Sequence, residues 1–480
     1  GPVSGPGEMR GFGAAVPRPG RSDMTEEEKW MDGYAELVTG EPRLGFFWDS
    51  AGHALPFPGE LNVAKEGQTE IRVPLLRPRQ GTDRTEFDEL YEKLVGWGKG
   101  PSRVVPTSLL FRDAQGPVAL TGVRWAGTFP GLIGELRMRA SAAFFGKPTK
   151  LSDKYSVRLM ESELEGLHQF AGLKQLYWDE ETRRREGLEL AVALRQVDPI
   201  TWRADGFDFE IRTHTAKKGQ DGHYARVKES TRLVTQKIEG ATVQEHLRAQ
   251  RSVRALLVLT FGRQVRWEGH WVRSDAFDPV GSQKHFERVP TVRVAMEQTL
   301  GDVSARGDYW RHSDFPVAIL KELPPDALRG WTRCYLRSRL FRRAVDPAVE
   351  ALASTGGFAE MRIMVLAAAL DSFAYYSGRR DGYSLNEQLT WCLDQACISW
   401  PSIASNAKIA LRLAQVNNYL KHADREKVPS NEFLIATLLL LEVAARGQLL
   451  GTLKASDEVK AFFASSPPVM GARDALESAW

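Results

Sequence analysis

Cysteine is scarce in this sequence of 480 residues, which contains only Cys334, Cys392 and Cys397. An odd, sparse set of cysteines without Cys-x-x-Cys spacing does not build a disulfide framework or a zinc knuckle. We therefore expect a protein of the reducing cytoplasm. Histidine is also sparse, with nine residues scattered singly. Because no two of them have the spacing of metal ligands on a helix or hairpin, we predict neither a metal site nor a cofactor.

Uninterrupted apolar runs long enough to span a bilayer are absent. The longest candidate, FLIATLLLLEVAA from Phe433 to Ala445, contains Glu442 and is too short, so we expect a soluble protein without membrane contact. The first residues, GPVSGPGEMRGFGAAVPRPG, have no apolar segment of a signal peptide, and the leading Gly-Pro resembles the remnant of a cleaved purification tag. We predict that residues 1–24 form a disordered tail.

Several common catalytic signatures are missing as well. The sequence has no phosphate-binding G-x-x-x-x-G-K-[ST] loop, no H-E-x-x-H zinc motif and no G-x-S-x-G nucleophile motif. Charge gives no stronger indication, because 64 Lys and Arg residues nearly balance 61 Asp and Glu residues, for a net charge of +3. A basic patch for a nucleic acid could still lie on one face without changing that total.

The chain from Gly45 to about Trp271 consists of short apolar or alternating runs separated by Gly, Pro and Asp. TEIRVPLL, SLLFR and FDFEIRTHT are examples. Runs of this length and period predict strands of a mainly antiparallel, sandwich-like sheet. Two segments within it, Arg84 to Val95 and Glu161 to Phe170, are predicted to be helical. A third, VQEHLRAQRSVRALLVLTFG, is predicted to be a helix that continues into an apolar strand.

From Asp326 onward the pattern becomes helical. The segment AEMRIMVLAAALDSFAYY is apolar on more than one face, which is typical of a central helix in a bundle. SLNEQLTWCLDQ begins with a capping box formed by Ser384 and Glu387. NEFLIATLLLLEVAARGQLLGTL is predicted to end with Gly451 as its C-terminal cap.

The predicted fold class is therefore α+β with several domains. Strands followed by a run of helices indicate a β-rich, mainly antiparallel N-terminal domain and an all-α bundle rather than one mixed unit. We predict the β-rich region at 25–325, the helical bundle at 326–465 and a C-terminal tail at 466–480.

The helical segment WTRCYLRSRLFRR interleaves arginines with Trp331, Tyr335 and Phe341. Arginine and aromatic side chains together suit a polyanion, because phosphate contacts and base stacking use those residue types. The alternative is a solvated helix face whose aliphatic stems cover apolar surface, and the sequence leaves both open. The candidate RNA-binding residues here are Arg333, Arg337, Arg339, Arg342 and Arg343.

The stretch QVNNYLKHADREK, from Gln415 to Lys427, places His422 beside amides, a lysine and an arginine at the end of a predicted helix. Metal-free RNA cleavage needs a base near the attacking 2′-hydroxyl and a cation near the phosphate. Histidine is the natural proton carrier at neutral pH, and arginine neutralises developing phosphate charge. His422 is therefore a candidate catalytic residue.

The segment from Asn417 to His422 resembles the motif of the HEPN superfamily, a helical bundle whose third helix ends in Arg-polar-x-x-x-His. Asp371 in LAAALDSFAYY takes the place of the acidic residue in the helix that opens such domains. More specifically, the chain resembles the ApeA-type anti-phage defence proteins, which combine a β-rich N-terminal domain with an ApeA-like HEPN domain. The N-terminal likeness lies in GFFWDSAGHALPFPGELNVAKEGQTEIRVPLL and, further on, in DKYSVRLMESELEGLHQF and LKQLYW.

This resemblance implies a metal-independent HEPN endoribonuclease, a toxin-like effector of abortive infection that cleaves cellular or phage RNA, with tRNA among the candidates. It implies that His422 transfers a proton to or from the 2′-hydroxyl and that Asn418 orients the substrate or the histidine. The product would carry a 2′,3′-cyclic phosphate. The resemblance also implies a homodimer through the bundle, and an N-terminal domain that senses a phage-derived trigger.

The sequence departs from the motif at one position, where Asn417 replaces the arginine and supplies no fixed positive charge. Arg425 and Arg412 are the candidate substitutes, and Lys421 is a candidate RNA contact. Arg412 precedes His422 by ten residues, about 15 Å along a helix. The alternative function is a catalytically weakened HEPN protein that serves as an RNA- or nucleotide-binding, scaffold or dimerisation module. A plain helix terminus remains the third interpretation.

Overall fold

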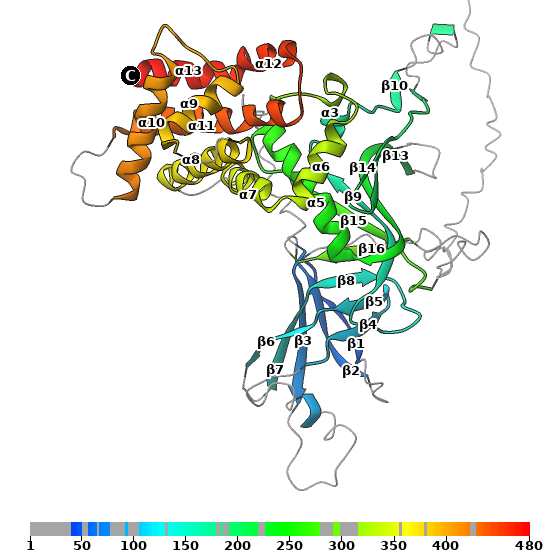
Figure 1. Ribbon diagram of the computed structural model, residues 1–480. Coiled ribbons are helices and arrows are strands. Elements are labelled where there is room, and N and C mark those ends of the chain that lie inside the picture. Colours follow the sequence, from blue (N-terminus) through cyan, green and yellow to red (C-terminus); the bar gives the residue numbers. More distant parts are fainter. Residues whose placement is uncertain are drawn as a thin grey trace, which may run out of the picture.

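The computed structural model describes residues 40–49, 56–64, 67–76, 92–94, 105–129, 133–178, 184–185, 192–218, 226–278, 291–297, 315–354, 358–378, 382–422 and 429–480. The tail predicted at 1–24 and almost all of the helix predicted from Arg84 to Val95 lie outside these residues. The described residues form a β-rich N-terminal part and a helical C-terminal part (Figure 1). The coarse prediction of an α+β protein is therefore confirmed.

The β-rich part is built around one antiparallel sheet of 14 strands, in the order β12-β13-β14-β9-β15-β16-β8-β5-β4-β1-β2-β3-β7-β6. A separate two-stranded ribbon is formed by β10 (Leu176–Trp178) and β11 (Val192–Leu194). In chain order the strands of the large sheet are β1 (Arg43–Asp49), β2 (Phe57–Val63), β3 (Thr69–Leu76), β4 (Ser108–Asp113), β5 (Gly116–Thr121), β6 (Arg124–Phe129), β7 (Ile133–Ala140), β8 (Ala142–Phe145), β9 (Ser156–Leu164), β12 (Ile200–Ala204), β13 (Phe207–Lys218), β14 (Arg226–Thr242), β15 (Trp267–Arg273) and β16 (Thr291–Met296).

The prediction of a sandwich-like arrangement is corrected by the strand pairing. Because β8 pairs with both β5 and β16, hydrogen bonds connect all 14 strands into one sheet and not into two separate sheets. The segment TEIRVPLL forms β3 as predicted, since its apolar residues alternate along the strand.

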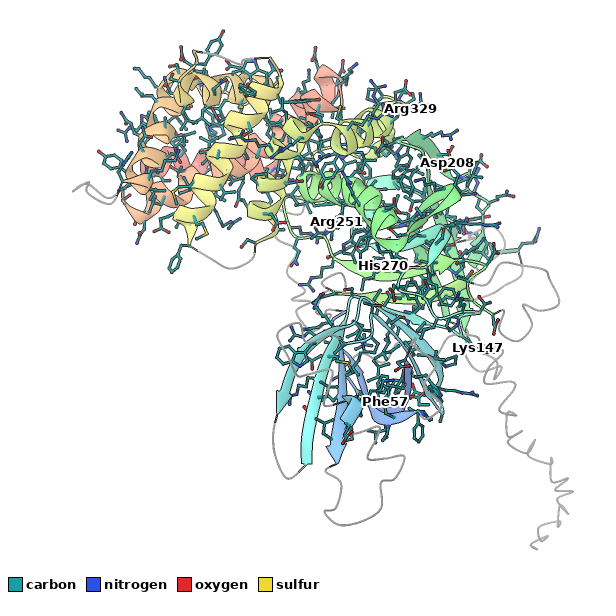
Figure 2. All side chains as sticks on the ribbon, turned by 60° about the horizontal axis from the view of Figure 1, so that its bottom comes forward. Phe57, Lys147, Asp208, Arg251, His270 and Arg329 are labelled. Atoms are coloured by element: carbon teal, nitrogen blue, oxygen red, sulfur yellow. The ribbon has the colours of Figure 1, made fainter. Side chains whose placement is uncertain are left out.

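Strands β1 to β7 curl around a core of their own (Figure 1), which contains Phe57, labelled in Figure 2. The ring of Phe47 lies 5.5 Å from that of Phe57 and 4.8 Å from that of Phe111, centroid to centroid. Gly45 and Gly59 face each other across β1 and β2. A Cβ atom at Gly59 would lie 2.9 Å from the Phe47 ring, and one at Gly45 would lie 2.7 Å from the Phe111 ring. The glycine pair therefore lets these two rings pack directly on the backbone.

The other half of the sheet is covered on one face by helix α5 (Val243–Phe261) (Figure 1). The predicted change from helix to strand within VQEHLRAQRSVRALLVLTFG is wrong, because the whole segment is this one helix. It begins at a capping box of Thr242 and Glu245 and ends at Gly262, whose φ is 69°. A short apolar run does not distinguish a strand from a buried helix, and here packing against the sheet buries nearly every residue from Val253 to Phe261.

The helix predicted from Glu161 to Phe170 is also wrong. Residues Ser156–Leu164 form β9, and only Leu167–Ala171 form a short helix, α3. Gly166 separates the two with φ 78°. Glu161 and Glu163 of this segment are buried in a strand that pairs with β14 and β15.

The helical part begins at Ala327, directly after Asp326, which confirms the predicted start of the helices. Its helices are α6 (Ala327–Arg337), α7 (Arg339–Ala353), α8 (Ala359–Tyr376), α9 (Leu385–Gln395), α10 (Asn406–Lys421), α11 (Asn431–Thr452), α12 (Asp457–Ala464) and α13 (Pro467–Ala479), preceded by the 3-10 turn η4 (Leu320–Glu322). The capping box of Ser384 and Glu387 at the start of α9 is confirmed.

Three details of the helical part differ from the predictions. The arginine-rich segment is two helices, because the backbone turns at Ser338 (φ −96°, ψ 112°), whose hydroxyl caps α7. Helix α11 continues through Gly451 to Thr452. Residues 466–480 do not form a tail: they contain α13, which packs on α11 and buries Val469, Ala472 and Leu476.

Helix α11 is the one helix of the described residues that is long and apolar enough to cross a membrane by length and composition. However, 78% of its apolar window is buried inside the protein. Its burial against α8, α9 and α13 is that of a core helix of the bundle.

The bundle and the α5 half of the sheet share one hydrophobic core. The indole nitrogen of Trp331 in α6 donates to the carbonyl of Ser252 in α5 at 2.7 Å. The indole nitrogen of Trp202 in β12 donates to Thr332 in α6 at 3.2 Å. Buried side chains therefore form one continuous core on both sides of the predicted domain boundary between 325 and 326. The division into separate domains at that boundary stays a prediction.

Arg446 in α11 is a charged residue at the contact between the bundle and α5. Its side chain is buried, with 2% of the residue exposed. The guanidinium donates to the carbonyls of Leu259, Thr260 and Phe315, at 3.0 Å in the case of Thr260. Its charge also complements the negative C-terminal end of α5.

Replacing Arg446 by methionine is expected to lower the free energy of unfolding by about 3 kcal/mol, because buried carbonyls lose their donors. Methionine fills much of the space of the arginine stem, so loss of packing is limited. Urea denaturation measures the effect, and Arg248→Met on the exposed side of α5 is the matched control. A loss no greater than that of the control would contradict the prediction.

Candidate functional site at the end of helix α10

Helix α10 is amphipathic, and its buried stripe packs on α9 and α8. At its start, the side-chain amide of Asn406 donates to Asp394 at 2.7 Å and to the carbonyl of Ile398 at 2.8 Å. The buried residues of the helix are Ile409, Ala410, Leu413, Ala414, Val416 and Asn417. These contacts fix which residues at the other end of the helix face solvent.

His422 is the first residue after α10, with φ −121° and ψ 105°, and its backbone N–H donates to the carbonyl of Tyr419 at 3.3 Å. Its side chain is exposed, as are those of Lys421 and Asn418. Asn418 precedes His422 by four residues, about one helical turn. These three exposed residues therefore lie within about one turn of each other along the chain, at the end of α10 and on the side of the bundle away from the sheet (Figure 1).

Asn417 differs from its neighbour Asn418 in that it lies inside the bundle. Only 1% of the residue is exposed, and its side-chain oxygen has no hydrogen-bond partner in the described part of the chain. It follows Leu413 by four residues and Ala414 by three, so it continues the apolar stripe of α10. In this position Asn417 does not reach a phosphate at the protein surface. The helical spacing was the signal that could have revealed its burial.

The guanidinium of Arg412 contacts two aromatic rings, those of Phe433 and Trp480. Its guanidinium carbon lies 5.4 Å from the ring centroid of Phe433 in α11 and 5.0 Å from that of Trp480, just after α13. Such cation–π contacts hold the charge next to α11 and α13. The structure does not bring Arg412 to His422. The other candidate substitute, Arg425, lies outside the described residues.

Two arginines of α6 and α7 are bonded to other groups within the protein, and the other three predicted RNA-binding arginines face solvent. Arg342 donates to the carbonyls of Tyr335 and Leu336 at 2.6 and 2.9 Å and thereby caps the end of α6. Arg337 pairs with Asp205 at 3.0 Å. The side chains of Arg333, Arg339 and Arg343 are exposed.

These helices adjoin α5 and the sheet, whereas α10 lies at the opposite side of the bundle (Figure 1). The arginine-rich segment and the end of α10 are therefore two separate surfaces.

Within the residues that the structure describes, no three His, Cys, Asp or Glu side chains are grouped so as to hold a metal ion. Comparison of the chain with protein-family models, with curated proteins and with solved structures gives no match.

Replacing Asn417 by arginine tests the position of this residue. We expect Asn417→Arg to destabilise the protein by about 3 kcal/mol, because a charged side chain would be forced into the bundle without a partner, and we expect no gain of RNA cleavage. Asn418→Arg is the matched control at the exposed neighbour and should change stability by less than about 0.5 kcal/mol. Urea denaturation and an RNA cleavage assay measure both. A stable Asn417→Arg protein with increased cleavage would contradict the prediction.

Proposed function

We propose that the chain is a cytoplasmic anti-phage defence protein of the abortive-infection type. Its C-terminal bundle acts as a HEPN-like, metal-independent endoribonuclease on cellular or phage RNA. The observation that carries this proposal is the exposed group of Asn418, Lys421 and His422 at the end of α10. A histidine, an amide and a cation within one helical turn are the residue types that proton transfer and phosphate binding require.

In this mechanism the imidazole of His422 takes the proton of the ribose 2′-hydroxyl, and the 2′-oxygen attacks the adjacent phosphorus. The bond from phosphorus to the 5′-oxygen breaks, and a second acid returns a proton to that oxygen. The products carry a 2′,3′-cyclic phosphate and a 5′-hydroxyl. Lys421 offsets the charge of the phosphate, and Asn418 orients the substrate or the imidazole.

A second copy of the bundle would supply the second acid and more positive charge. Exposed apolar side chains at the start of α8 and on α11 support such a homodimer: Phe358, the N-cap of α8, is 77% exposed, Met361 61% and Ile435 53%. The two helices pack on each other and are joined by the ion pair of Arg362 and Glu442. Burial raises the pKa of the Glu442 carboxyl, and the charge of Arg362 opposes that shift. Exposed apolar groups of this kind are typical of interaction surfaces.

The β-rich part would sense a phage-derived trigger and pass its effect to the bundle. The shared core and the buried contacts of Trp331 and Arg446 support this coupling, because a change in the sheet half would move packed side chains of the helices.

The burial of Asn417 favours a second candidate function. Where the HEPN motif has an arginine, this chain has a side chain that does not reach the surface. The bundle would then bind RNA or a nucleotide, or act as a scaffold, without cleaving it.

The experiment that separates the two candidates incubates the purified full chain with end-labelled RNA in the presence of EDTA. Cleavage that yields 2′,3′-cyclic phosphate ends supports the endoribonuclease. Binding of the RNA without cleavage supports the second candidate. Cleavage that appears only after addition of a divalent metal would contradict the proposed mechanism.

A further inference from the structure

The face of the sheet that is turned away from α5 carries arginines and glutamates around one tryptophan. Ser162 of β9 bonds to Gln250 of α5 at 2.5 Å, so its neighbours Glu161 and Glu163 point to the opposite face. We call this surface the arginine–tryptophan face. It consists of Glu161, Glu163, Arg212, Arg232, Trp271, Arg273 and Arg293.

Strand register brings these residues together from five strands. Arg212 of β13 lies directly opposite Arg232 of β14, which lies opposite Glu163 of β9. In the next row, Trp271 of β15 lies between Glu161 and Arg293 of β16. Two arginines directly opposite each other destabilise a sheet unless other charges offset them.

The two glutamates hold the arginines in place and are themselves covered. Glu161 accepts hydrogen bonds from Arg212 and Arg232 and lies 3.5 Å from the guanidinium of Arg273. Glu163 accepts from the Nε of Arg232 at 3.1 Å. The Glu161 side chain is only 4% exposed, whereas those of Arg212 and Arg273 are 30% and 45% exposed. The solvent-facing groups of the cluster are therefore the guanidiniums.

The indole ring of Trp271 lies next to the backbone of β15 and between two arginines. A Cβ atom at Gly269, two residues earlier on β15, would lie 2.7 Å from the indole ring, so the absence of a side chain there makes room for the ring. The guanidinium carbon of Arg232 lies 4.0 Å from the ring centroid and that of Arg293 lies 5.8 Å from it. The indole is thus fixed in position, and its residue remains partly exposed.

We propose that the arginine–tryptophan face binds single-stranded RNA. One base stacks on the face of the Trp271 indole that Arg232 does not cover, and the adjoining phosphates contact the exposed guanidiniums of Arg273 and Arg212. Single-stranded nucleic acids are commonly bound in this way, by aromatic rings on a sheet surface and by arginines along the backbone. The four arginines of the face outnumber the three glutamates Glu161, Glu163 and Glu210, the last of which lies beside Arg212, so the face has a net positive charge. The face is distant from the end of α10 (Figure 1), so RNA binding here does not depend on cleavage there.

The test measures binding of a fluorescein-labelled oligouridylate by fluorescence anisotropy, with the full chain carrying His422→Ala so that cleavage does not interfere. Arg273→Gln and Trp271→Leu are each expected to weaken binding roughly tenfold. Arg273→Gln should also reduce the dependence of affinity on salt, because one phosphate contact is lost.

The matched control is Arg124→Gln on β6, a 51% exposed arginine paired with Glu297, which should bind as the parent does. If both variants bind like this control, the proposal is overturned. Arg273→Gln leaves Glu161 bonded to Arg212 and Arg232, so it alone decides the question if Trp271→Leu does not fold. Because the parent already lacks His422, a failure of the proposed nuclease mechanism does not alter this outcome.

Discussion

Replacing His422 by alanine is expected to lower the rate of RNA cleavage by roughly 10²- to 10⁴-fold, the range over which a proton-transfer group contributes to catalysis. His422 is exposed and lies after the last turn of α10, so its removal leaves no cavity in the bundle. The free energy of unfolding should therefore change by less than about 0.5 kcal/mol. A time course of cleavage of labelled RNA, followed alongside urea denaturation, measures both quantities.

The matched control is His168→Ala, which removes an exposed histidine of α3, a short helix that packs on β14. Cleavage should then be unchanged. The mechanism also predicts that Asn418→Ala weakens cleavage about tenfold, because an orienting group contributes less than the proton-transfer group. If His422→Ala cleaves RNA as fast as His168→Ala does, His422 has no catalytic role.

Acidification from pH 6.5 towards pH 4 is expected to destabilise the protein steeply through two buried histidines. Burial lowers the pKa of His246 to about 4 and that of His270 to about 3. In the unfolded chain both have a pKa near 6.5, so the unfolded state binds protons in this range while the folded state does not. Stability is present above the unfolded pKa and is lost as pH falls, by about 1.4 kcal/mol per pH unit for each histidine.

The hydrogen bonds around these histidines give the structural reason. Nδ1 of His270 lies 2.8 Å from the hydroxyl of Ser162, which donates to Gln250, so Nδ1 carries the proton. Nε2 of His270 has no hydrogen-bond partner among the described residues. A second proton on this ring would therefore be a buried charge without an acceptor. His246 is held between Thr235 and the carbonyl of Val157, at 2.9 and 3.1 Å.

Urea denaturation at several pH values between 7.5 and 4.5 measures this dependence. His246→Gln removes one titrating group, keeps a polar side chain and should make the slope of stability against pH shallower by up to about 1.4 kcal/mol per pH unit. An equally steep loss in His246→Gln would show that other groups cause the acid effect. A flat profile in the parent protein would contradict the prediction for both histidines.

Much of the local structure follows from the sequence because it depends on neighbouring residues. The alternation in TEIRVPLL predicts β3, the capping box of Ser384 and Glu387 predicts the start of α9, and the apolar segment after Phe358 predicts α8. The errors occur where local patterns are ambiguous. The apolar end of α5 fits a strand or a buried helix equally well, and packing on the sheet decides in favour of the helix.

At the candidate site, too, some features follow from the local sequence and others depend on tertiary packing. The sequence by itself determined that His422 follows a helix and that polar side chains gather there. Only tertiary packing decided that Asn417 lies inside the bundle and Asn418 outside, because the faces of α10 are set by α8 and α9. Packing also placed Arg412 against the rings of Phe433 and Trp480.

The arginine–tryptophan face could not be predicted from the sequence at all. Its members stand on five strands that are separated by up to about 130 positions in the chain, and only strand pairing and register bring them into adjacent rows. Sequence patterns thus determined the elements and the residue types available at the end of α10. The tertiary structure decided which charges meet, because contacts between distant segments depend on register and packing that no local pattern encodes.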